Sequence, residues 1–530
     1  MCLREILRVH QRQRVGNELE RDRIETGKVW LVGAGPGDQE LLTVKGRRLL
    51  EEGDCFVYDR LVGGGILGLI PAGRDRIDVG KKNGRHTVCQ EEINEILIRE
   101  AKKGKKVIRL KGGDPFLFGR GGEEAEALSK QHIPFEVVPG ISSAIAVPAY
   151  GGIPVTHRDF ASGLHIVTAH PQDGKAGAIP YEALVKAGGT LVFLMGVSAI
   201  EKLMEGLCLG GMDKTMPAVI LEQGTLAGQR KISATVGTLA AKAREEQIKP
   251  PAVIVVGQVC ALESRLQWYE HLPLAGKRIL VTRPRDRGFK LQRQLQALGA
   301  EVLSVPTVET VPVEDASEAM AIRAELERLQ EYDVLAFTSP YGVERFFELL
   351  WEAGKDARAV SHMKFAAIGQ GTADALAKRG LRADYMPKQY DGVSLGRLLA
   401  AKLGEGTRIL LARSSLGTAE ILRELDRNKG ITYRDLPVYR TRYAKEDPGL
   451  LKSLMEEGTI DCAVFTSSST VEGFLRMFGP FPFETVTAVC IGQKTQEAAQ
   501  RAGMRTAVSK NATTEDLVDL ISRLRFTGAL

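Results

Sequence analysis

The sequence predicts an α/β protein with four lobes, two in its N-terminal half and two in its C-terminal half. Three observations lead to this prediction. Apolar runs with strand character alternate with segments of helical spacing, glycine makes up 57 of 530 residues, and the C-terminal half contains an approximate internal repeat. At roughly 150 residues per domain, the length allows three to four domains.

Regular structure is expected to begin at Lys28, after a charge-dense extension over residues 1–27. KVWLVGAG has the pattern of a strand that ends in glycines, and QELLTVKGRRLLEEG has helical spacing. The alternation continues through CFVYD, EEINEILIREAKKG, KKVIRLKGG, GGEEAEALSKQ and PFEVVPG. Strands that alternate with helices indicate a mainly parallel sheet, which predicts a first lobe over about residues 28–150.

A second α/β lobe is predicted over about residues 151–262, from the strand-like runs LHIVTAH, TLVFLMG, PAVILEQG and PAVIVVGQV. Residues 263–276 have weaker periodicity and are interrupted by Pro273 and Gly276, so we expect a linker there. A new α/β segment starts with KRILVTRP, which predicts a separate domain over residues 277–530.

The internal repeat lies in this last domain. VLAFTSPYGVERFFELL (334–350) resembles CAVFTSSSTVEGFLRMF (462–478), and FAAIGQGTADALAKRGLRADYMP (365–387) resembles AVCIGQKTQEAAQRAGMRTAVSK (488–510). Each copy has a strand that ends in Thr-Ser, followed by a strand that ends in Ile-Gly. We expect two similar lobes with a ligand cleft between them; general likeness among α/β units is the alternative.

Composition excludes several classes of protein. Lys plus Arg exceed Asp plus Glu by 72 to 66, a formal charge of +6 that is too small to indicate nucleic-acid binding. The 7 cysteines are odd in number and include no CxxC pair, so we expect reduced thiols in a cytoplasmic protein and no metal site. We identify no signal peptide and no apolar run of about 18 residues, so no membrane association is expected.

Glycine-rich junctions in the N-terminal half indicate a small-molecule site. GAGPGD (33–38) follows a strand, but Asp38 replaces the last glycine of the G-x-G-x-x-G pattern and would repel a pyrophosphate, which disfavours a dehydrogenase. In RLKGGDPFLFGRGGEE, Gly112 and Gly113 would bring the backbone against a flat ligand, and Asp114 can accept hydrogen bonds. Each motif also has a structural interpretation, as a tight turn or a helix cap.

Two further segments carry charged groups that suit a polyanionic substrate. Asp59 follows a predicted strand, where α/β enzymes place functional groups, although a helix cap or a salt bridge is an equal alternative. VGKKNGRH places cations together at Lys81, Lys82, Arg85 and His86, which suits an anion-binding loop or a solvated one.

Seven motifs of the N-terminal half together resemble one family. GAGPGDxELLTxKG, YDRLV, VGKKxGxH, QEEIN, RLKGGDPFxFGRGGEE, VPGISS and GIPxTHRD occur in one order over about residues 28–262. They resemble the uroporphyrinogen-III C-methyltransferases of the tetrapyrrole methylase family, whose two α/β lobes bind S-adenosylmethionine between them. The resemblance implies transfer of two methyl groups, giving precorrin-2, and a homodimer formed through this half.

The resemblance also implies roles for individual residues. It makes Asp59 the proton acceptor and Lys81 the proton donor, with Arg85 and His86 beside Lys81 for the carboxylates of the tetrapyrrole. It places cofactor contacts at nine positions: Pro36, Gly112, Gly113, Asp114, Leu117, Ser142, Ser143, Met195 and Gly224.

The C-terminal half resembles a second family over about residues 276–525. GKRILVTRP, VLAFTSPYGV, FAAIGxxTA, PVYRT, FTSSSTV and CIGxKT are similar to motifs of uroporphyrinogen-III synthases. That resemblance implies closure of hydroxymethylbilane into uroporphyrinogen III with loss of water, and Tyr439 as the hydrogen-bond partner of the departing hydroxyl. The substrate carboxylates would be bound by Thr338, Ser339, Thr466, Ser467 and Thr495.

Two alternatives stay open at this point. The N-terminal half could be a sister methylase that acts on a later precorrin, although LKGGDPFxFGRGGEE and VGKKxGxH favour the uroporphyrinogen enzyme. The C-terminal half is compatible with a two-lobed binding domain that has no catalytic role. Whether the final product is sirohaem, cobalamin or haem d1 is not decided by these motifs.

Overall fold

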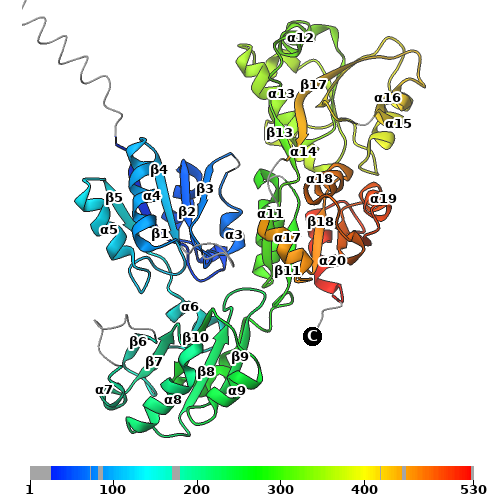
Figure 1. The fold of residues 1–530 in the computed structure, drawn as a ribbon. Helices are drawn as coiled ribbons and strands as arrows, with labels where there is room; N and C mark the ends of the chain where they lie inside the picture. The colour runs from blue at the N-terminus through cyan, green and yellow to red at the C-terminus, as the bar shows by residue number, and fades with distance from the viewer. Residues whose placement is uncertain are drawn as a thin grey trace, which may run out of the picture.

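The structure, a computed structural model, describes residues 26–71, 73–80, 88–169, 179–283, 285–417, 419–444 and 449–526. Over these residues the chain forms four five-stranded sheets. Figure 1 shows helices packed on the sheets. Each sheet is the centre of one lobe, and the lobes are numbered first to fourth. The predicted α/β class is therefore confirmed.

The first lobe has a fully parallel sheet in the order β3-β2-β4-β1-β5. Its central strands β1 and β4 are buried on both faces, as is typical of a parallel sheet covered by helices. The elements are β1 (Lys28–Gly33), η1 (Gln39–Leu41), α2 (Val44–Glu52), β2 (Cys55–Tyr58), α3 (Gly64–Leu67), β3 (Asp75–Asp78), α4 (Gln90–Lys102), β4 (Lys106–Lys111), α5 (Gly121–Lys130), β5 (Phe135–Val138) and α6 (Ser143–Tyr150).

The second lobe has a mixed sheet in the order β6-β7-β10-β8-β9, in which β6 and β7 are parallel and the other pairs are antiparallel. The polar edge strand β9 was missed by the sequence analysis because its run RKISAT has little apolar character. The elements are β6 (Leu164–Thr168), α7 (Tyr181–Ala187), β7 (Thr190–Leu194), η2 (Val197–Ala199), α8 (Ile200–Leu209), β8 (Pro217–Glu222), β9 (Arg230–Thr235), α9 (Leu239–Glu245), β10 (Ala252–Val256), η3 (Gln258–Leu262) and α10 (Glu263–Leu266).

The third lobe combines the two ends of the C-terminal half in a parallel sheet of order β12-β11-β18-β19-β20. The intervening chain forms the fourth lobe, so two connections join these lobes. The elements of the third lobe are β11 (Arg278–Val281), α11 (Arg285–Ala297), β12 (Glu301–Ser304), α17 (Gly449–Glu456), β18 (Cys462–Phe465), α18 (Ser468–Phe478), η6 (Phe483–Thr485), β19 (Thr487–Cys490), α19 (Gln493–Arg501), β20 (Arg505–Val508) and α20 (Thr514–Arg523).

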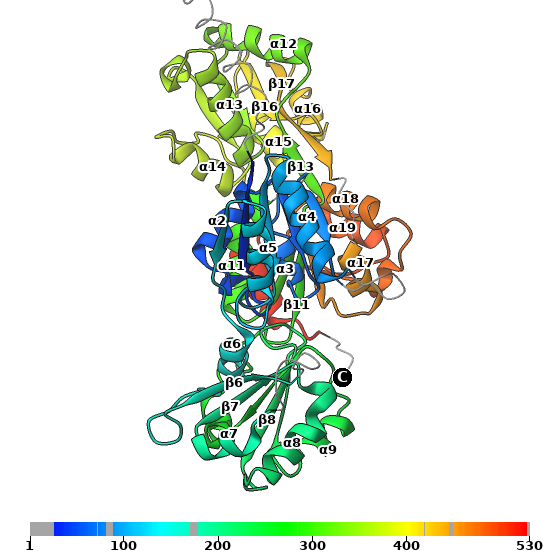
Figure 2. The same cartoon turned by 60° about the vertical axis from the view of Figure 1, so that its left-hand side comes forward.

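The fourth lobe has the strand order β13-β17-β16-β14-β15, with β13 antiparallel to β17. Figure 2 shows this lobe above the third one. Its elements are β13 (Val308–Val311), α12 (Ala316–Glu327), η4 (Leu329–Glu331), β14 (Val334–Phe337), α13 (Pro340–Glu352), η5 (Ala357–Val360), β15 (Lys364–Ala367), α14 (Gln370–Ala377), α15 (Gly392–Lys402), β16 (Arg408–Ser414), α16 (Glu420–Leu425) and β17 (Thr432–Tyr443).

The internal repeat corresponds to the same local structure in the two C-terminal lobes. After β14, the Ser339 hydroxyl accepts from the Gly342 amide at 3.0 Å and caps α13. After β18, the Ser467 hydroxyl accepts from the Thr470 amide at 3.3 Å and caps α18. The repeated Thr-Ser thus marks a capped strand-to-helix junction in each lobe.

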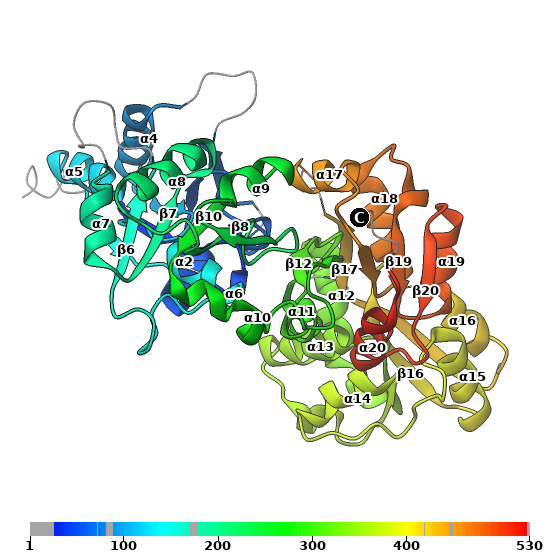
Figure 3. The same ribbon diagram turned by 90° about the horizontal axis from the view of Figure 1, so that it is seen from below.

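The segment between the two halves is packed rather than extended away from the protein. Tyr269 and Leu274 are buried, and the rings of Trp268 and Tyr269 lie 5.1 and 5.0 Å from that of Tyr150 at the end of α6. Figure 3 shows α10 between the second lobe and α11 of the third lobe. Because the Tyr269 hydroxyl also donates to the Gly299 carbonyl at 3.2 Å, the linker is joined to both halves of the chain.

The halves also meet directly along β12, the edge strand of the third lobe. The Gln39 side-chain amide donates to the Val302 carbonyl at 3.2 Å, and the Ala227 amide donates to the Glu301 carboxylate at 2.9 Å. Glu301 is in turn paired with Arg278 at 3.0 Å. The loops of the N-terminal half that carry Gln39 and Ala227 are therefore docked on the C-terminal half.

Candidate functional site

The glycine-rich loops after β1, β4 and β5 meet at one edge of the first sheet. The Gly113 amide donates to the Gly35 carbonyl at 2.7 Å, and the Gly35 amide donates back to the Gly113 carbonyl at 3.1 Å. A Cβ atom on Gly33 would lie 2.5 Å from the Gly140 Cα atom, so both positions need glycine. The three loops consequently pack backbone against backbone at the carboxyl ends of parallel strands, where α/β proteins bind ligands.

The adjacent glycines Gly112 and Gly113 have different surroundings. A Cβ atom on Gly112 would lie 2.5 Å from the Leu61 Cβ atom, so Gly112 allows two loops to pack. A Cβ atom on Gly113 would find its nearest neighbour, the Ser142 Cα atom, 3.8 Å away. The backbone of Gly113 is therefore open to the close approach of a ligand, which fits a cofactor lying against it.

Asp114 holds two of these loops together. One carboxylate oxygen accepts from the amides of Phe116 and Leu117 at 2.8 and 3.0 Å, and the other accepts from the Gly140 amide at 3.0 Å. From its sequence motif, this side chain is expected to accept hydrogen bonds from a ligand. Its established contacts in the structure are with backbone amides, which makes it an organiser of the loops.

Asp38 connects the first lobe to the second. Its carboxylate accepts from the Tyr150 hydroxyl at 2.7 Å and from the Glu40 amide at 2.8 Å. Its backbone amide donates to the Thr225 hydroxyl at 3.1 Å. Asp38 thus joins the loop that holds Pro36 to the loop that holds Gly224.

The remaining predicted cofactor contacts lie around this junction. Ser142 caps α6 through a 3.2 Å bond from the Ala144 amide to its hydroxyl, and Ser143 begins that helix. A Cβ atom on Gly224 would lie 2.3 Å from a methyl group of Val147 on α6, so glycine is needed for this packing. Met195 follows β7 with an exposed side chain and a φ of 57°.

Strained backbone concentrates in these same loops. Besides Met195, positive φ angles occur at Phe118, Arg120, Gln223 and Thr225, at 54°, 57°, 47° and 71°. Such conformations cost free energy in non-glycine residues, and they cluster at ligand sites where the surrounding structure enforces them. The strain supports a ligand site at the junction of the first and second lobes.

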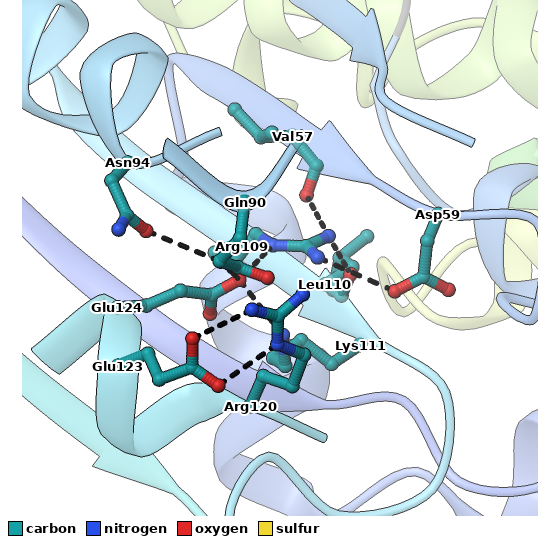
Figure 4. A network of polar contacts seen from close by, with 10 residues as sticks. All are labelled: Val57, Asp59, Gln90, Asn94, Arg109, Leu110, Lys111, Arg120, Glu123 and Glu124. Atoms are coloured by element: carbon teal, nitrogen blue, oxygen red, sulfur yellow. Dashed lines mark hydrogen bonds and ion pairs between the residues drawn. The ribbon is translucent and has the colours of Figure 1, made fainter. Parts of the chain in front are cut away.

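Asp59 follows β2 and contacts a buried network of charges, shown in Figure 4. One of its carboxylate oxygens accepts from the Leu61 amide at 3.1 Å, and the other lies 3.5 Å from the Arg109 guanidinium. Arg109 and Lys111 both pair with Glu124, at 3.1 and 2.8 Å. Burial, followed by the charge of Arg109, lowers the pKa of Lys111, and the carboxylate of Glu124 opposes both effects.

Three predicted site residues lie outside the described residues. They are Lys81, Arg85 and His86, within the segment 81–87. Their assigned roles stay predictions.

In the fourth lobe, a predicted substrate-binding serine contacts the predicted catalytic tyrosine. The hydroxyls of Ser339 and Tyr439 share a hydrogen bond of 2.9 Å, and the ring of Tyr341 packs edge-on against Tyr439 with a centroid distance of 4.8 Å. Thr338 lies beside Ser339 at the end of β14 and is half-buried. Tyr439 is itself largely buried, with its hydroxyl at the junction of β17 and α13.

The third lobe holds the equivalent groups. Thr466 and Ser467 follow β18, and Thr495 is buried in the first turn of α19. Lys494, next to Thr495, forms an ion pair with Glu420 on α16 of the fourth lobe. The repeated hydroxyl-bearing junctions therefore belong to two lobes that are linked by an ion pair.

Several residues of the site were missed by the sequence analysis. RLKGGD contains Arg109 and Lys111, but their pairing with Glu124 depends on α5 packing against β4. Thr225 directly follows Gly224 in a motif that the sequence singled out, but its hydrogen bond with the Asp38 amide was not predicted. Tyr150 ends an apolar helix, and nothing in the local sequence indicates its bond to Asp38.

The part of the chain that the structure describes holds no group of three or more His, Cys, Asp or Glu side chains arranged to bind a metal ion. Nor does any described helix have the length and apolar character to cross a membrane.

Comparisons with known proteins match both halves of the chain. Residues 28–240 match the family of tetrapyrrole (corrin/porphyrin) methylases, and residues 290–519 match uroporphyrinogen-III synthase HemD. The porphyrin biosynthesis protein HemD of Ruminiclostridium josui is 45% identical over 94% of this chain and 98% of its own length.

Two further similarities concern the N-terminal half. The S-adenosyl-L-methionine-dependent uroporphyrinogen III methyltransferase of Methanosarcina barkeri is 51% identical over 45% of this chain and 94% of its own length. A crystal structure of uroporphyrin-III C-methyl transferase from Thermus thermophilus complexed with S-adenyl homocysteine is 39% identical, with a TM-score of 0.39, over 44% of this chain and 99% of that one.

Proposed function

The chain belongs to the family of the porphyrin biosynthesis protein HemD, and we propose that it makes precorrin-2 from hydroxymethylbilane in two successive activities. It is a tetrapyrrole biosynthesis enzyme in which a uroporphyrinogen-III methyltransferase domain precedes a uroporphyrinogen-III synthase domain. The synthase half closes the bilane into uroporphyrinogen III, and the methyltransferase half transfers two methyl groups to that ring.

One observation carries this proposal. The porphyrin biosynthesis protein HemD of Ruminiclostridium josui matches this chain at 45% identity across both halves, and in this chain a methylase match is followed by a synthase match. The product of the second half is then the substrate of the first.

The methyltransferase site is proposed at the junction of the first two lobes. S-adenosylmethionine supplies an already activated methyl group, so the protein's task is mainly to orient it towards the ring carbon. The open backbone of Gly113, the backbone around Leu117 and the start of α6 at Ser142 and Ser143 would hold the cofactor. Asp59 would take up the proton that the methylated ring releases, with Lys81 as proton donor.

The synthase site is proposed between the third and fourth lobes. Hydroxymethylbilane loses its hydroxyl readily, so the protein mostly has to fold and orient the chain. The hydroxyls of Thr338, Thr466 and Thr495, with the capping serines Ser339 and Ser467, would bind its carboxylates. Tyr439 would hydrogen-bond the departing hydroxyl. The methyltransferase half would also form a homodimer, as its resemblance implies.

A single reaction tests both halves. The protein is incubated with hydroxymethylbilane and S-adenosylmethionine, and the products are followed by absorbance and mass spectrometry. We expect a product two methyl groups heavier than uroporphyrinogen III, and an Asp59→Ala variant that stops at the unmethylated type III ring.

Other outcomes would overturn one half or the other. Formation of the type I ring alone would disprove the synthase assignment. Authentic uroporphyrinogen III added to the same mixture then tests the methyltransferase separately, and its recovery without methylation would disprove that assignment too.

A further inference from the structure

The first lobe contains a network of buried charges directly behind Asp59. The side chains of Arg109, Lys111 and Glu124 are 3%, 4% and 0% exposed, whereas that of Asp59 is 27% exposed. Buried ions are expensive to desolvate, and apolar residues of similar size often stabilise a core equally well. The network therefore calls for an explanation other than stability alone.

The charges of this network balance only when Asp59 is included. Glu124 is a single carboxylate that faces two cations, Arg109 at 3.1 Å and Lys111 at 2.8 Å. Gln90 donates to the same Glu124 oxygen at 3.3 Å, and the other oxygen has no hydrogen-bond partner among the described residues. Asp59 supplies the second negative charge, at the end where the network reaches the cleft.

Arg109 is held in one orientation by partners on three sides. Its Nε atom donates to Glu124, and its Nη1 atom donates to the Leu110 carbonyl at 2.8 Å and the Val57 carbonyl at 3.5 Å. Val57 lies on β2, two residues before Asp59. The remaining Nη2 atom is the one that points at the Asp59 carboxylate, as Figure 4 shows.

We propose that Arg109, locked by Glu124, is the positioning residue that orients the Asp59 carboxylate for methyl transfer. The Leu61 amide donates to one oxygen of that carboxylate at 3.1 Å, and the Arg109 guanidinium forms an ion pair with the other oxygen at 3.5 Å. Each carboxylate oxygen of Asp59 has a further lone pair. By fixing the orientation of the carboxylate, Arg109 keeps these lone pairs directed at the substrate. This inference rests on the proposed role of Asp59 as proton acceptor.

Lys111 provides a matched comparison within the same network. It pairs with the same Glu124 oxygen and is equally buried, but among the described residues no ion pair or hydrogen bond joins it to Asp59, whose charge acts on it only from a longer distance. Arg109→Met and Lys111→Met each remove one buried cation beside Glu124. A purely structural role of the network predicts similar effects for the two variants, whereas the positioning role predicts different ones.

The experiment measures methylation of uroporphyrinogen III by the full chain, together with the Kd for S-adenosylhomocysteine. For Arg109→Met we expect kcat to fall about 10- to 100-fold, since misplaced catalytic groups lose rate on that scale, with Kd within about 2-fold. Lys111→Met is expected to keep kcat within about 3-fold. Arg109→Lys retains the charge but not the planar guanidinium, so its kcat should fall by about as much as that of Arg109→Met.

A double-mutant cycle provides the decisive measurement. Once Asp59→Asn has removed the oriented carboxylate, adding Arg109→Met should cost little more, because the two residues act through one interaction. Multiplicative losses would overturn the inference, as would an Arg109→Lys variant with normal kcat. If Arg109→Met does not fold, Arg109→Lys decides the matter in the same cycle.

Failure of this inference can be told apart from failure of the proposed function. If Asp59→Ala abolishes methylation while both Arg109 variants turn over normally, only the positioning role is wrong. If Asp59→Ala itself methylates at the normal rate, the proposed proton acceptor is wrong.

Discussion

The hydroxyl of Tyr150 donates a 2.7 Å hydrogen bond to the carboxylate of Asp38, so the last residue of α6 is tied to the loop after β1. Burial, and then the charge of Asp38, raise the pKa of Tyr150 well above its ordinary value. The phenol therefore stays a neutral donor throughout the physiological pH range. Through this bond, α6 and the Pro36 loop keep a fixed relative position.

Loss of this bond should weaken cofactor binding. A hydrogen bond to a charged group contributes about 1.5–3 kcal/mol, and part of that holds the loop in its binding conformation. We expect Tyr150→Phe to raise the Kd for S-adenosylhomocysteine about 3- to 10-fold by calorimetry. The control is Tyr433→Phe, which removes a similar 2.8 Å bond to Asp426 in the fourth lobe; an equal effect there would argue against the prediction.

A side chain at Gly113 should block the cofactor. Its Cβ atom would make only van der Waals contact with the protein, 3.8 Å from the Ser142 Cα atom, at a φ of 68° that strains other residues. Gly113→Ala strains the backbone but adds only one methyl group, whereas Gly113→Val strains the backbone and also adds a bulky side chain. We expect S-adenosylhomocysteine binding to survive in part in the first variant and to be lost in the second, with synthase activity retained in each.

The control for this prediction is a glycine that has open surroundings and no positive φ. Gly122, on α5, has no atom within 4 Å of a built Cβ and no positive φ. Gly122→Val should bind S-adenosylhomocysteine like the unchanged protein. Normal binding by Gly113→Val would show that the cofactor does not approach this backbone.

The contact between the two halves should depend on Glu301. This carboxylate accepts from the Ala227 amide at 2.9 Å and from Arg278 at 3.0 Å. We expect Glu301→Ala to loosen the docking and to speed tryptic cleavage after Arg265 or Lys277 several-fold. Glu309→Ala, which breaks a 2.9 Å ion pair with Arg442 inside the fourth lobe, serves as the control and should leave cleavage unchanged.

Acid should destabilise the first lobe through Glu100. Burial opposes its ionisation, but hydrogen bonds from Lys103, Lys105 and Arg99 outweigh that effect and lower its pKa to about 2. A carboxyl group with a depressed native pKa stabilises the fold above its unfolded pKa, about 4.3, and loses that contribution as the pH falls towards 2.

The corresponding variant is Glu100→Gln, whose amide does not titrate. Because its cationic partners are partly exposed to solvent, we expect a contribution of about 1–2 kcal/mol, which is below the value for a fully buried pair. Chemical denaturation at pH 7 and pH 3 should show a smaller loss in Glu100→Gln than in the unchanged protein. Equal losses would contradict the assigned role of this carboxylate.

Local sequence patterns were sufficient for much of the fold. The run KVWLVG is apolar and ends in glycine, which predicts β1 from its own residues. The polar run RKISAT did not predict β9, because that strand is held by pairing with β8 and not by its own apolar character. The predicted linker over 263–276 contains Tyr269 and Leu274, which are buried by partners far away in the sequence.

The sequence by itself determined the α/β class, the repeated Thr-Ser junctions and the glycine loops around Gly35 and Gly113, because turns, caps and apolar periodicity depend on neighbouring residues. The tertiary structure decided that Asp114 ties two loops together, and that Arg109 lies between Glu124 and Asp59. Those contacts join β2, β4 and α5. Their geometry follows from sheet register and helix packing, which bring together charges that no local pattern pairs.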